Sequence, residues 1–346
     1  MARLLPISNR EAAAPLVMVE DLHVKFVSRD ETVEAVNGVS ISLRHGEVLC
    51  IIGESGSGKS VTMRALMSLL PKRRTQISGS MRIGDHDILA LSERQLAKLR
   101  GSVVSMIFQE PMTALDPVYT IGHQIAETVV RHEGISWRAA QDRALELLQL
   151  VKVPSPERRL QSYPHELSGG LRQRAMIAIA LSCRPALLLA DEPTTALDAT
   201  VQIQVLVLLR NLQREFGMGL IFVTHDMGVA AQIADEVAVM YAGRIVEYGS
   251  ARDVLMNPRH PYTIGMLAST VHGEMRGKDI EAIPGSAPDL HALPPGCSFA
   301  PRCKSAVSDC IASVPPVAMV APGHGASCIR LGEDCGPGAS RAIFNS

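Results

Sequence analysis

The residues with the most recognisable chemistry lie in a glycine-rich segment early in the chain. Residues Gly53–Ser60 read GESGSGKS, which matches the P-loop pattern G-x-x-x-x-G-K-S. The run Val48–Ile52 before it is continuously apolar, as in a strand buried on both faces, and an apolar-faced helical run follows it until Pro71. Glycines let backbone N–H groups converge on phosphate oxygens, and a helix N-terminus adds its positive dipole end. These flanking elements favour a phosphate-binding loop over a chance match in an ordinary turn.

Two side chains of this loop have separate predicted roles. Lys59 is expected to bridge the β- and γ-phosphates of a nucleoside triphosphate, and the Ser60 hydroxyl is expected to ligate Mg²⁺. The candidate phosphate-binding residues are Gly53, Ser55, Gly56, Gly58, Lys59 and Ser60.

Two carboxylates follow a second buried strand. The apolar run 187–190 ends at Asp191 and Glu192, and ligands bind at such strand ends in α/β sheets. Asp191 is expected to hold Mg²⁺, mostly through water, and Glu192 to polarise the water that attacks the γ-phosphate. Taken alone, the pair would indicate an acidic surface turn. In a chain with a P-loop, the catalytic interpretation is favoured.

A histidine follows a third apolar strand. The run Leu220–Val223 leads to Thr224 and His225. His225 is predicted to hydrogen-bond the γ-phosphate and to hold the attacking water, whereas a histidine at a strand end more often has a structural role.

A second glycine pair opens a predicted helix. Residues Leu167–Arg174 read LSGGLRQR and precede the helical run Ala175–Cys183. Ser168 is predicted to cap that helix, and Gly169 and Gly170 to open backbone N–H groups toward an anion. The pattern indicates a second phosphate site, with a simple serine-capped helix as the alternative.

The elements that must position these residues alternate between apolar strands and helices. Between residues 16 and about 265 this rhythm predicts an α/β domain with a mainly parallel sheet. Val17–Val27 and Val39–Leu43 alternate as half-buried antiparallel strands do. Residues from about 110 to 165 are predicted to be mostly helical, most clearly at Trp137–Val151, and to form an insertion.

The tail after about residue 268 is rich in proline, glycine and cysteine. It is predicted to be too proline-rich for a helical or sheet core and to need a staple. Four thiolates can hold Zn²⁺ or an iron–sulfur cluster, although the close pairs typical of structural zinc are absent. Cys335 is the spare thiol, and free cysteines in a loose tail are the alternative. The candidate ligands, spaced C-x5-C-x6-C-x17-C, are Cys297, Cys303, Cys310 and Cys328.

Composition narrows the class of protein. Among 346 residues, 34 Lys and Arg balance 35 Asp and Glu, and aromatic residues make up 3%, so a nucleic-acid binder is disfavoured. We expect no signal peptide, and no apolar run reaches the roughly 18 residues that cross a bilayer. The protein is therefore expected to be soluble by itself and cytoplasmic.

The order of the P-loop, the LSGG segment and the acidic strand resembles the ABC transporter ATPase family, up to about residue 267. The resemblance implies an ATP- and Mg²⁺-dependent ATPase with a P-loop NTPase (RecA-like) core, an antiparallel β subdomain, a helical insertion and a small C-terminal extension. Gln109 looks like the Q-loop glutamine, which senses Mg²⁺. Phe26 looks like the aromatic residue that stacks on adenine, and Asp198 in Ala196–Asp198 looks like the D-loop aspartate. Because the family pairs two ATPase subunits head to tail, Ser168 would serve the nucleotide of a partner.

Several segments are similar to ATP-binding subunits of oligopeptide and dipeptide importers. They are QEPMTALDP at 109–117, YPHELSGG at 163–170, NPRHPYT at 257–263 and GCSFAPRC at 296–303. The resemblance implies peptide import, with nickel or glutathione import as alternatives, and a 4Fe-4S cluster on the tail cysteines. The implied partners are two permease subunits, a second ABC ATPase and an extracytoplasmic solute-binding protein. The implied location is peripheral, at the cytoplasmic face of the inner membrane.

The expected organisation has three parts. Residues 1–15 form an N-terminal tail, 16–267 the ABC ATPase domain and 268–346 the cysteine-rich extension. One rival is a non-transport ABC ATPase acting on DNA or ribosomes, which would carry fused cassettes or coiled-coil arms. A second rival binds ATP without turnover, and the presence of both Glu192 and His225 speaks against it.

Overall fold

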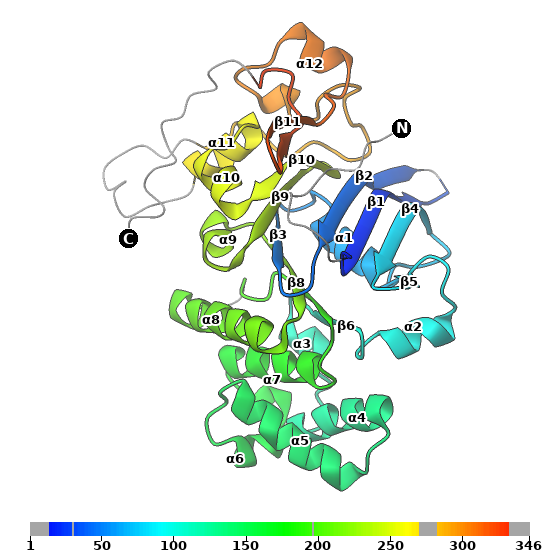
Figure 1. Ribbon diagram of the computed structural model, residues 1–346, viewed down its shortest axis with the longest axis vertical. Coiled ribbons are helices and arrows are strands. Elements are labelled where there is room, and N and C mark those ends of the chain that lie inside the picture. The colour runs from blue at the N-terminus through cyan, green and yellow to red at the C-terminus, as the bar shows by residue number, and fades with distance from the viewer. Residues whose placement is uncertain (1–13, 30, 196, 270–281, 332–346) are drawn as a thin grey trace. The chain divides into compact units, whose positions relative to one another are not determined.

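The computed structural model describes residues 14–29, 31–195, 197–269 and 282–331 (Figure 1). The chain divides into two compact units. Unit 1 is formed by Met1–Arg44, Val48–Leu89 and Thr224–Ser346, and unit 2 by His45–Glu47 and Ala90–Val223. None of the described helices is long and apolar enough to cross a membrane.

Unit 1 contains an antiparallel sheet in the order β2-β1-β4-β5. Its strands are β1 (Val17–Val27), β2 (Thr32–Leu43), β4 (Thr75–Ile83) and β5 (His86–Asp87). Alternate residues of β1 are buried, which gives the half-buried pattern that the sequence predicts. Strand β2 begins at Thr32, seven residues before the predicted start, because it pairs with β1 along nearly its whole length.

The second sheet of unit 1 carries the glycine-rich loop. Strand β3 (Val48–Ile52) is buried throughout and pairs in parallel with β9 (Glu236–Tyr241), which pairs antiparallel with β10 (Arg244–Ser250). Helix α1 (Lys59–Leu66) starts directly after the loop and ends five residues before Pro71, so the predicted helix was too long. The other helices here are α9 (Met227–Ile233), α10 (Ala251–Met256) and α11 (Pro261–Ala268).

The C-terminal extension adds strands to this sheet, so the prediction that it could not join a sheet core was wrong. Strand β12 (His324–Ala326) pairs antiparallel with β10, and β11 (Ala318–Ala321) pairs with β12. The strands avoid the prolines and form where β10 offers an edge. The extension also contains the 3₁₀ turn η3 (Ala300–Arg302) and the short helix α12 (Ser308–Ala312).

The β12 strand is fixed by a buried carboxylate. Glu247 on β10 lies 2.8 Å from His324 Nε2 and accepts hydrogen bonds from the backbone N–H groups of Arg259 (2.7 Å) and His260 (2.8 Å). Both Glu247 and His324 are buried. A buried carboxylate needs such partners to offset its lost hydration. Glu247 therefore joins β10, β12 and the start of α11.

Unit 2 contains three parallel strands, β8-β7-β6 in order. They are β6 (Val104–Ile107), β7 (Leu187–Asp191) and β8 (Gly219–Thr224), and all their residues are buried. Helix α7 (Gly169–Leu181) precedes β7 in the chain, and helix α8 (Ala199–Phe216) connects β7 to β8. Burial on both faces explains why most of each strand is a continuous hydrophobic run in the sequence.

A group of helices lies between β6 and α7 in the sequence. They are α3 (Pro111–Ala114), α4 (Ile121–Glu133), α5 (Trp137–Leu150), α6 (Pro156–Leu160) and the 3₁₀ turn η1 (Pro164–Glu166), and α2 (Glu93–Leu99) precedes β6. Ala126, Val129 and Ala140 form a small buried core between α4 and α5. Thr120 and Ser136 cap these two helices by accepting backbone N–H bonds.

Candidate nucleotide site and cysteine pocket

The glycine-rich loop of unit 1 is built around positions that exclude a side chain. Gly58 has a φ of +103°, and a Cβ there would lie 2.5 Å from the carbonyl oxygen of Ala35 and 2.7 Å from Met240 Cε. A Cβ at Gly53 would collide with the carbonyl oxygen of Met240. Strands β2 and β9 therefore approach the loop too closely for a side chain at these two positions.

Lys59 is folded back into this loop. Its side chain is buried, and Nζ donates to the carbonyl oxygens of Gly53 (2.7 Å) and Glu54 (2.8 Å) and lies 3.3 Å from Ser57 Oγ. The loop therefore wraps around the Lys59 ammonium group, which holds its carbonyl oxygens in place. Ser60 follows on the first turn of α1 and is partly exposed, whereas Ser55 and Gly56 at the tip are exposed.

Glu54, inside the loop, is held by the C-terminal half of the chain. Its backbone N–H donates to the Tyr262 hydroxyl oxygen at 2.9 Å, and its carboxylate accepts two bonds from Arg302, at 2.8 and 3.1 Å. Burial raises the pKa of Tyr262, which keeps the phenol protonated. Sequence reasoning missed both Tyr262 and Arg302, since they lie more than 200 residues from the loop.

Two further predicted residues lie in unit 1. Phe26 is on β1, partly exposed, and is in register with Val33 on β2 and Thr75 on β4. His225 is exposed between β8 and α9. The next residue, Asp226, caps α9 by accepting from the backbone N–H groups of Gly228 and Val229. This cap fixes the backbone directly after His225.

The two predicted carboxylates of unit 2 lie at the end of β7. Asp191 is its last residue and is 2% exposed, and Glu192 is 9% exposed. Glu192 has a φ of +45°, although its N–H still donates to the carbonyl of Val223 at 3.0 Å, and its Oε2 accepts from Thr195 Oγ1 at 2.9 Å. Left-handed backbone at a non-glycine residue is strained and clusters at functional sites. The strain turns Glu192 out of the strand direction.

The LSGG segment and the predicted D-loop aspartate both lie next to Val201, in the first turn of α8. Asp198 caps α8 by accepting from the Val201 N–H at 3.0 Å. A Cβ at Gly170 would lie 2.8 Å from Val201 Cγ1, so any larger residue at this position of α7 would require the Val201 side chain to move. Gly169 opens α7, and Ala196 lies outside the described residues.

Ser168 does not cap α7 as the sequence predicted. It occupies the N-cap position, but its side chain makes no capping hydrogen bond. Its φ and ψ of −66° and 163° are nevertheless those of an N-cap residue. Gln109 is exposed two residues after the end of β6 and precedes α3.

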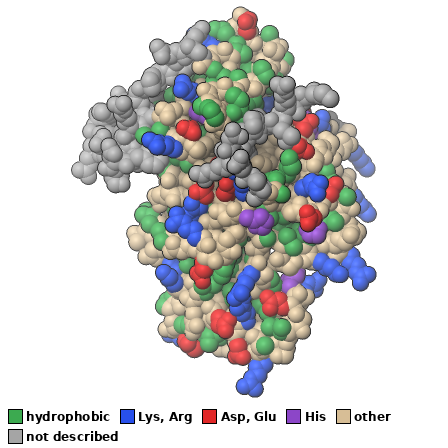
Figure 2. Space-filling view, in the orientation of Figure 1, with side chains coloured by type: hydrophobic (Ala, Val, Ile, Leu, Met, Phe, Trp, Pro, Cys, Tyr) green, Lys and Arg blue, Asp and Glu red, His purple; other side chains and the backbone are tan. Residues whose placement is uncertain are grey.

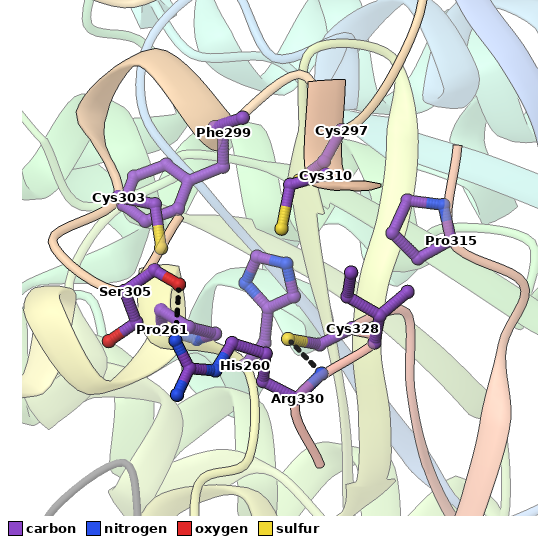
Figure 3. Close-up of a pocket in the computed structure, with 12 residues that line it drawn as sticks. His260, Pro261, Cys297, Phe299, Cys303, Ser305, Cys310, Pro315, Cys328 and Arg330 are labelled. Atoms are coloured by element: carbon purple, nitrogen blue, oxygen red, sulfur yellow. Dashed lines mark hydrogen bonds between the residues drawn. The ribbon is translucent and has the colours of Figure 1, made fainter. Parts of the chain in front are cut away.

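The four predicted cysteines of the extension line one pocket (Figure 3). Cys297, Cys303, Cys310 and Cys328 share it with His260 and Phe299, among other residues. The sulfur atoms of Cys303, Cys310 and Cys328 point toward its interior, where the His260 ring lies (Figure 3).

The pocket is ordered by backbone contacts. The Cys297 N–H donates to the carbonyl of Cys310 at 2.7 Å, and the Arg330 N–H donates to Cys328 Sγ at 3.4 Å. Burial raises the pKa of the Cys297 thiol.

His260 joins this pocket to the phosphate-loop side of unit 1. Burial lowers its pKa to about 4, so it is neutral, and Nδ1 accepts from the Tyr262 N–H at 3.1 Å. Among the described residues, no three His, Cys, Asp or Glu side chains are grouped so as to hold a metal ion. Cys335 lies outside the described residues.

Comparisons with known proteins match both halves of the chain. A family model described as ABC transporter matches residues 36–195, and one described as oligopeptide/dipeptide transporter, C-terminal region, matches residues 246–310. The oligopeptide transport ATP-binding protein OppD of Escherichia coli (strain K12) is 48% identical over 330 residues, which cover 95% of this chain and 97% of OppD. The chain belongs to the ABC transporter family, in its oligopeptide/dipeptide branch. The resemblance expected from the sequence is therefore confirmed.

Other relatives and solved structures agree with this ABC family assignment. The dipeptide transport ATP-binding protein DppD of Bacillus subtilis (strain 168) is 45% identical over 314 residues, covering 90% of this chain and 94% of DppD. A dimeric ATP-binding cassette in a post-hydrolysis state, bound to ADP and Pi, matches with a TM-score of 0.62 and 28% identity, covering 68% of this chain and 99% of that cassette. The chain is thus an ABC-type ATPase with the predicted P-loop NTPase fold.

The visible surface of this ABC ATPase has mixed charge. Lys and Arg side chains are interspersed with Asp and Glu over the described surface that Figure 2 shows. This pattern agrees with the formal net charge of −1.

Proposed function

We propose that this ABC ATPase drives the uptake of di- or oligopeptides through a separate membrane permease. The match of residues 246–310 to the oligopeptide/dipeptide C-terminal region supports this branch of the family. Names of relatives that are 45–48% identical, OppD and DppD, support peptides as the cargo class. The chain would work at the cytoplasmic face of the inner membrane with two permease subunits, a second ABC ATPase and an extracytoplasmic binding protein.

We further propose that the glycine-rich loop binds the triphosphate of ATP. The observation that carries this assignment is the buried Lys59, whose ammonium donates to the carbonyls of Gly53 and Glu54. A phosphate group would offer the ammonium a stronger, charge-assisted partner, so ATP can draw Lys59 out of these bonds. Gly56, Gly58 and Ser60 complete the cradle, with Ser60 and Asp191 as Mg²⁺ ligands, and Phe26 stacks on adenine.

Glu192 would polarise the water that attacks the γ-phosphate. His225 would contact the γ-phosphate, and Gln109 would contact Mg²⁺. Ser168, Gly169, Gly170 and Asp198 would complete the nucleotide site of the paired ATPase. The absence of a capping bond at Ser168 supports this role, because the hydroxyl is not committed to its own helix.

The direct test of the transport function uses a strain that lacks this chain and retains its permease partners. Radiolabelled di- and tripeptide uptake should return with the wild-type chain and not with Lys59→Ala, a change that removes the phosphate-binding ammonium. Nickel and glutathione uptake are measured in parallel. Restoration of one of these in place of peptide uptake would contradict the cargo assignment.

The cysteine pocket is proposed to hold a 4Fe-4S cluster. The donor type supports this, since Cys297, Cys303, Cys310 and Cys328 line one pocket and thiolates are the usual ligands of such clusters. In the described structure no three of them are grouped closely enough to hold a metal ion, so the cluster would have to draw the cysteines together. The cluster would order the proline-rich extension, and its thiolates must lose their protons to bind. Zn²⁺ is the alternative occupant.

Anaerobic purification tests the cluster. Brown protein with about four iron and four sulfide per chain is expected, and Cys303→Ser and Cys310→Ser should each lose the colour. Colourless protein that contains stoichiometric zinc would contradict the cluster.

We also propose the boundaries of three parts of the chain. The tail is 1–15, the ATPase domain is 16–267 with a helical part at about 110–165, and the extension is 268–346. Limited proteolysis between residues 268 and 297 is the test.

A further inference from the structure

We propose that Arg302 of the C-terminal extension is a positioning residue for nucleotide binding, acting on the phosphate loop through Glu54. This inference rests on the proposed role of the loop in binding ATP. It adds to the nucleotide site a residue that lies 248 positions after Glu54 in the chain.

The contact between the two residues is a two-pronged ion pair. Arg302 Nη1 donates to Glu54 Oε2 at 2.8 Å, and Nη2 donates to Oε1 at 3.1 Å. The Arg302 side chain is 8% exposed and that of Glu54 is 30% exposed. The planar guanidinium matches both carboxylate oxygens, so the pair fixes orientation as well as distance.

Arg302 is itself held on its other sides. Its Nε donates to the carbonyl of Pro284 at 2.9 Å, and Nη1 also donates to the Tyr241 hydroxyl at 3.2 Å. The guanidinium carbon lies 5.9 Å from the centre of the Tyr241 ring. The arginine is therefore pre-set before it meets Glu54, and little conformational freedom is lost when the pair forms.

An aromatic cluster anchors the turn that carries Arg302. Phe299 is buried and its ring centre lies 5.4 Å from that of Tyr241 and 5.5 Å from that of Tyr262. The rings of Tyr241 and Tyr262 are 4.5 Å apart. Packed aromatic rings of this kind contribute beyond their buried area. The turn Ala300–Arg302 is thereby docked on β9 and α11, which also supply the two tyrosines.

Glu54 is thus held at three points within the loop. Tyr262 binds its backbone N–H, Lys59 binds its carbonyl, and Arg302 binds its carboxylate. The Arg302 charge also neutralises a carboxylate in the loop that must receive a polyanion. Without Arg302 that carboxylate would repel the phosphates, and the loop would lose one of its three attachments.

A double-mutant cycle on the purified full-length chain tests this role. The assay measures the dissociation constant of a fluorescent ATP analogue in the presence of Mg²⁺. In the wild-type background the variants are Arg302→Ala, Arg302→Lys and Lys59→Ala. Arg302→Ala is also combined with Glu54→Gln and compared with Glu54→Gln alone. Arg302→Ala should weaken binding about tenfold, which corresponds to about 1.4 kcal/mol. Arg302→Lys should lose less, because it keeps the charge without the fork. In the Glu54→Gln background, Arg302→Ala should change the constant by less than about twofold.

Four comparisons decide the outcome. Arg143→Ala, which breaks an exposed pair with Glu146 on α5, is the matched control and should bind normally. If Arg302→Ala binds the analogue with the wild-type dissociation constant while Lys59→Ala binds it weakly, the role of Arg302 is contradicted and the proposed role of the loop is kept. An equal loss from Arg302→Ala in both backgrounds contradicts the role of Arg302 as well. If Lys59→Ala binds the analogue normally, the proposed role of the loop in ATP binding is contradicted, and the inference about Arg302 is contradicted with it. If Arg302→Ala does not fold, the same cycle is run with Arg302→Lys.

Discussion

Single residues of this ATPase are constrained by backbone as well as by chemistry. Glu192 combines a left-handed φ of +45° with a bond to Thr195, and Gly58 combines a φ of +103° with a close carbonyl from Ala35. Each position is fixed in a conformation that most side chains avoid. The chemistry assigned to Glu192 and the shape assigned to Gly58 can therefore be tested separately.

We expect Glu192→Gln to bind ATP normally and to lose hydrolysis. The amide keeps the size of the side chain and can still accept from Thr195, but it does not take a proton from water. General-base catalysis contributes about 10²–10⁴-fold, so the turnover should fall at least about 100-fold. Phosphate release and nucleotide binding are measured side by side. Unchanged phosphate release would remove Glu192 from its proposed role.

Gly58→Ala should reduce both stability and nucleotide binding. The new methyl group would meet the Ala35 carbonyl and Met240 while the backbone is held in left-handed geometry, a strain of about 1–3 kcal/mol. Gly134→Ala, at the φ of +67° that ends α4 with open space around it, is the matched control for backbone strain alone. Calorimetry should show the larger loss for Gly58→Ala, and equal losses would contradict the steric argument.

The functional residues of the loop and of the acidic strand could be predicted from the sequence because their chemistry is local. Lys59 and Ser60 follow the strand and glycines that position them, so a short pattern contains the whole argument. Arg302 and Tyr262 carry no such signal, because their contacts with Glu54 exist only after β9, α11 and the extension have folded. The positive φ of Glu192 could not be predicted either, because an acidic pair after a strand does not specify a left-handed backbone.

At the level of elements, the extension holds the main departure from expectation. Its prolines argued against any sheet, yet β12 pairs with β10 over a strand of three residues. A run reading His-Gly-Ala has no alternation that periodicity could detect. Its pairing is accompanied by the long-range contact between Glu247 and His324, which the local sequence does not reveal. Core strands such as β3 and β7 were predictable because continuous apolar runs mark them.

Glu247→Ala should destabilise unit 1 strongly. The change leaves the buried N–H of His260, the partly buried N–H of Arg259 and the buried His324 ring without their acceptor. Each unsatisfied buried group costs about 1–3 kcal/mol. The melting temperature should fall by several degrees, as measured by calorimetry. Glu146→Ala, which removes an exposed carboxylate paired with Arg143, should change stability by less than about 1 kcal/mol. Similar shifts for the two variants would contradict the structural role of Glu247.

At the level of the whole molecule, the proposed catalytic unit comprises two ATPase chains. The phosphate loop and the LSGG segment would then belong to different sites, each completed by another subunit. Pairing of this kind makes activity depend on association, so lesions in different parts can compensate each other.

Mixing two inactive variants tests this pairing. Lys59→Ala destroys the loop and Ser168→Arg blocks the LSGG segment, so neither variant should hydrolyse ATP alone. A mixed pair contains one site with both lesions and one intact site, and phosphate release should reappear on mixing. Two portions of Lys59→Ala from separate preparations form the control. No recovery, although differently tagged copies of the two variants co-purify as mixed dimers, would contradict the head-to-tail arrangement.

The pairing of β12 with β10 also bears on how the protein avoids self-association. A bare β10 would present a row of open amide and carbonyl groups, which is the template on which misassembled sheets grow. The extension moves the boundary outward to β11, a strand of only four residues that is followed by a turn. Cutting the chain before Cys297 should therefore yield a protein that precipitates on concentration, for a reason independent of ATP. The cysteine-rich tail would then serve the ATPase as a shield for its sheet.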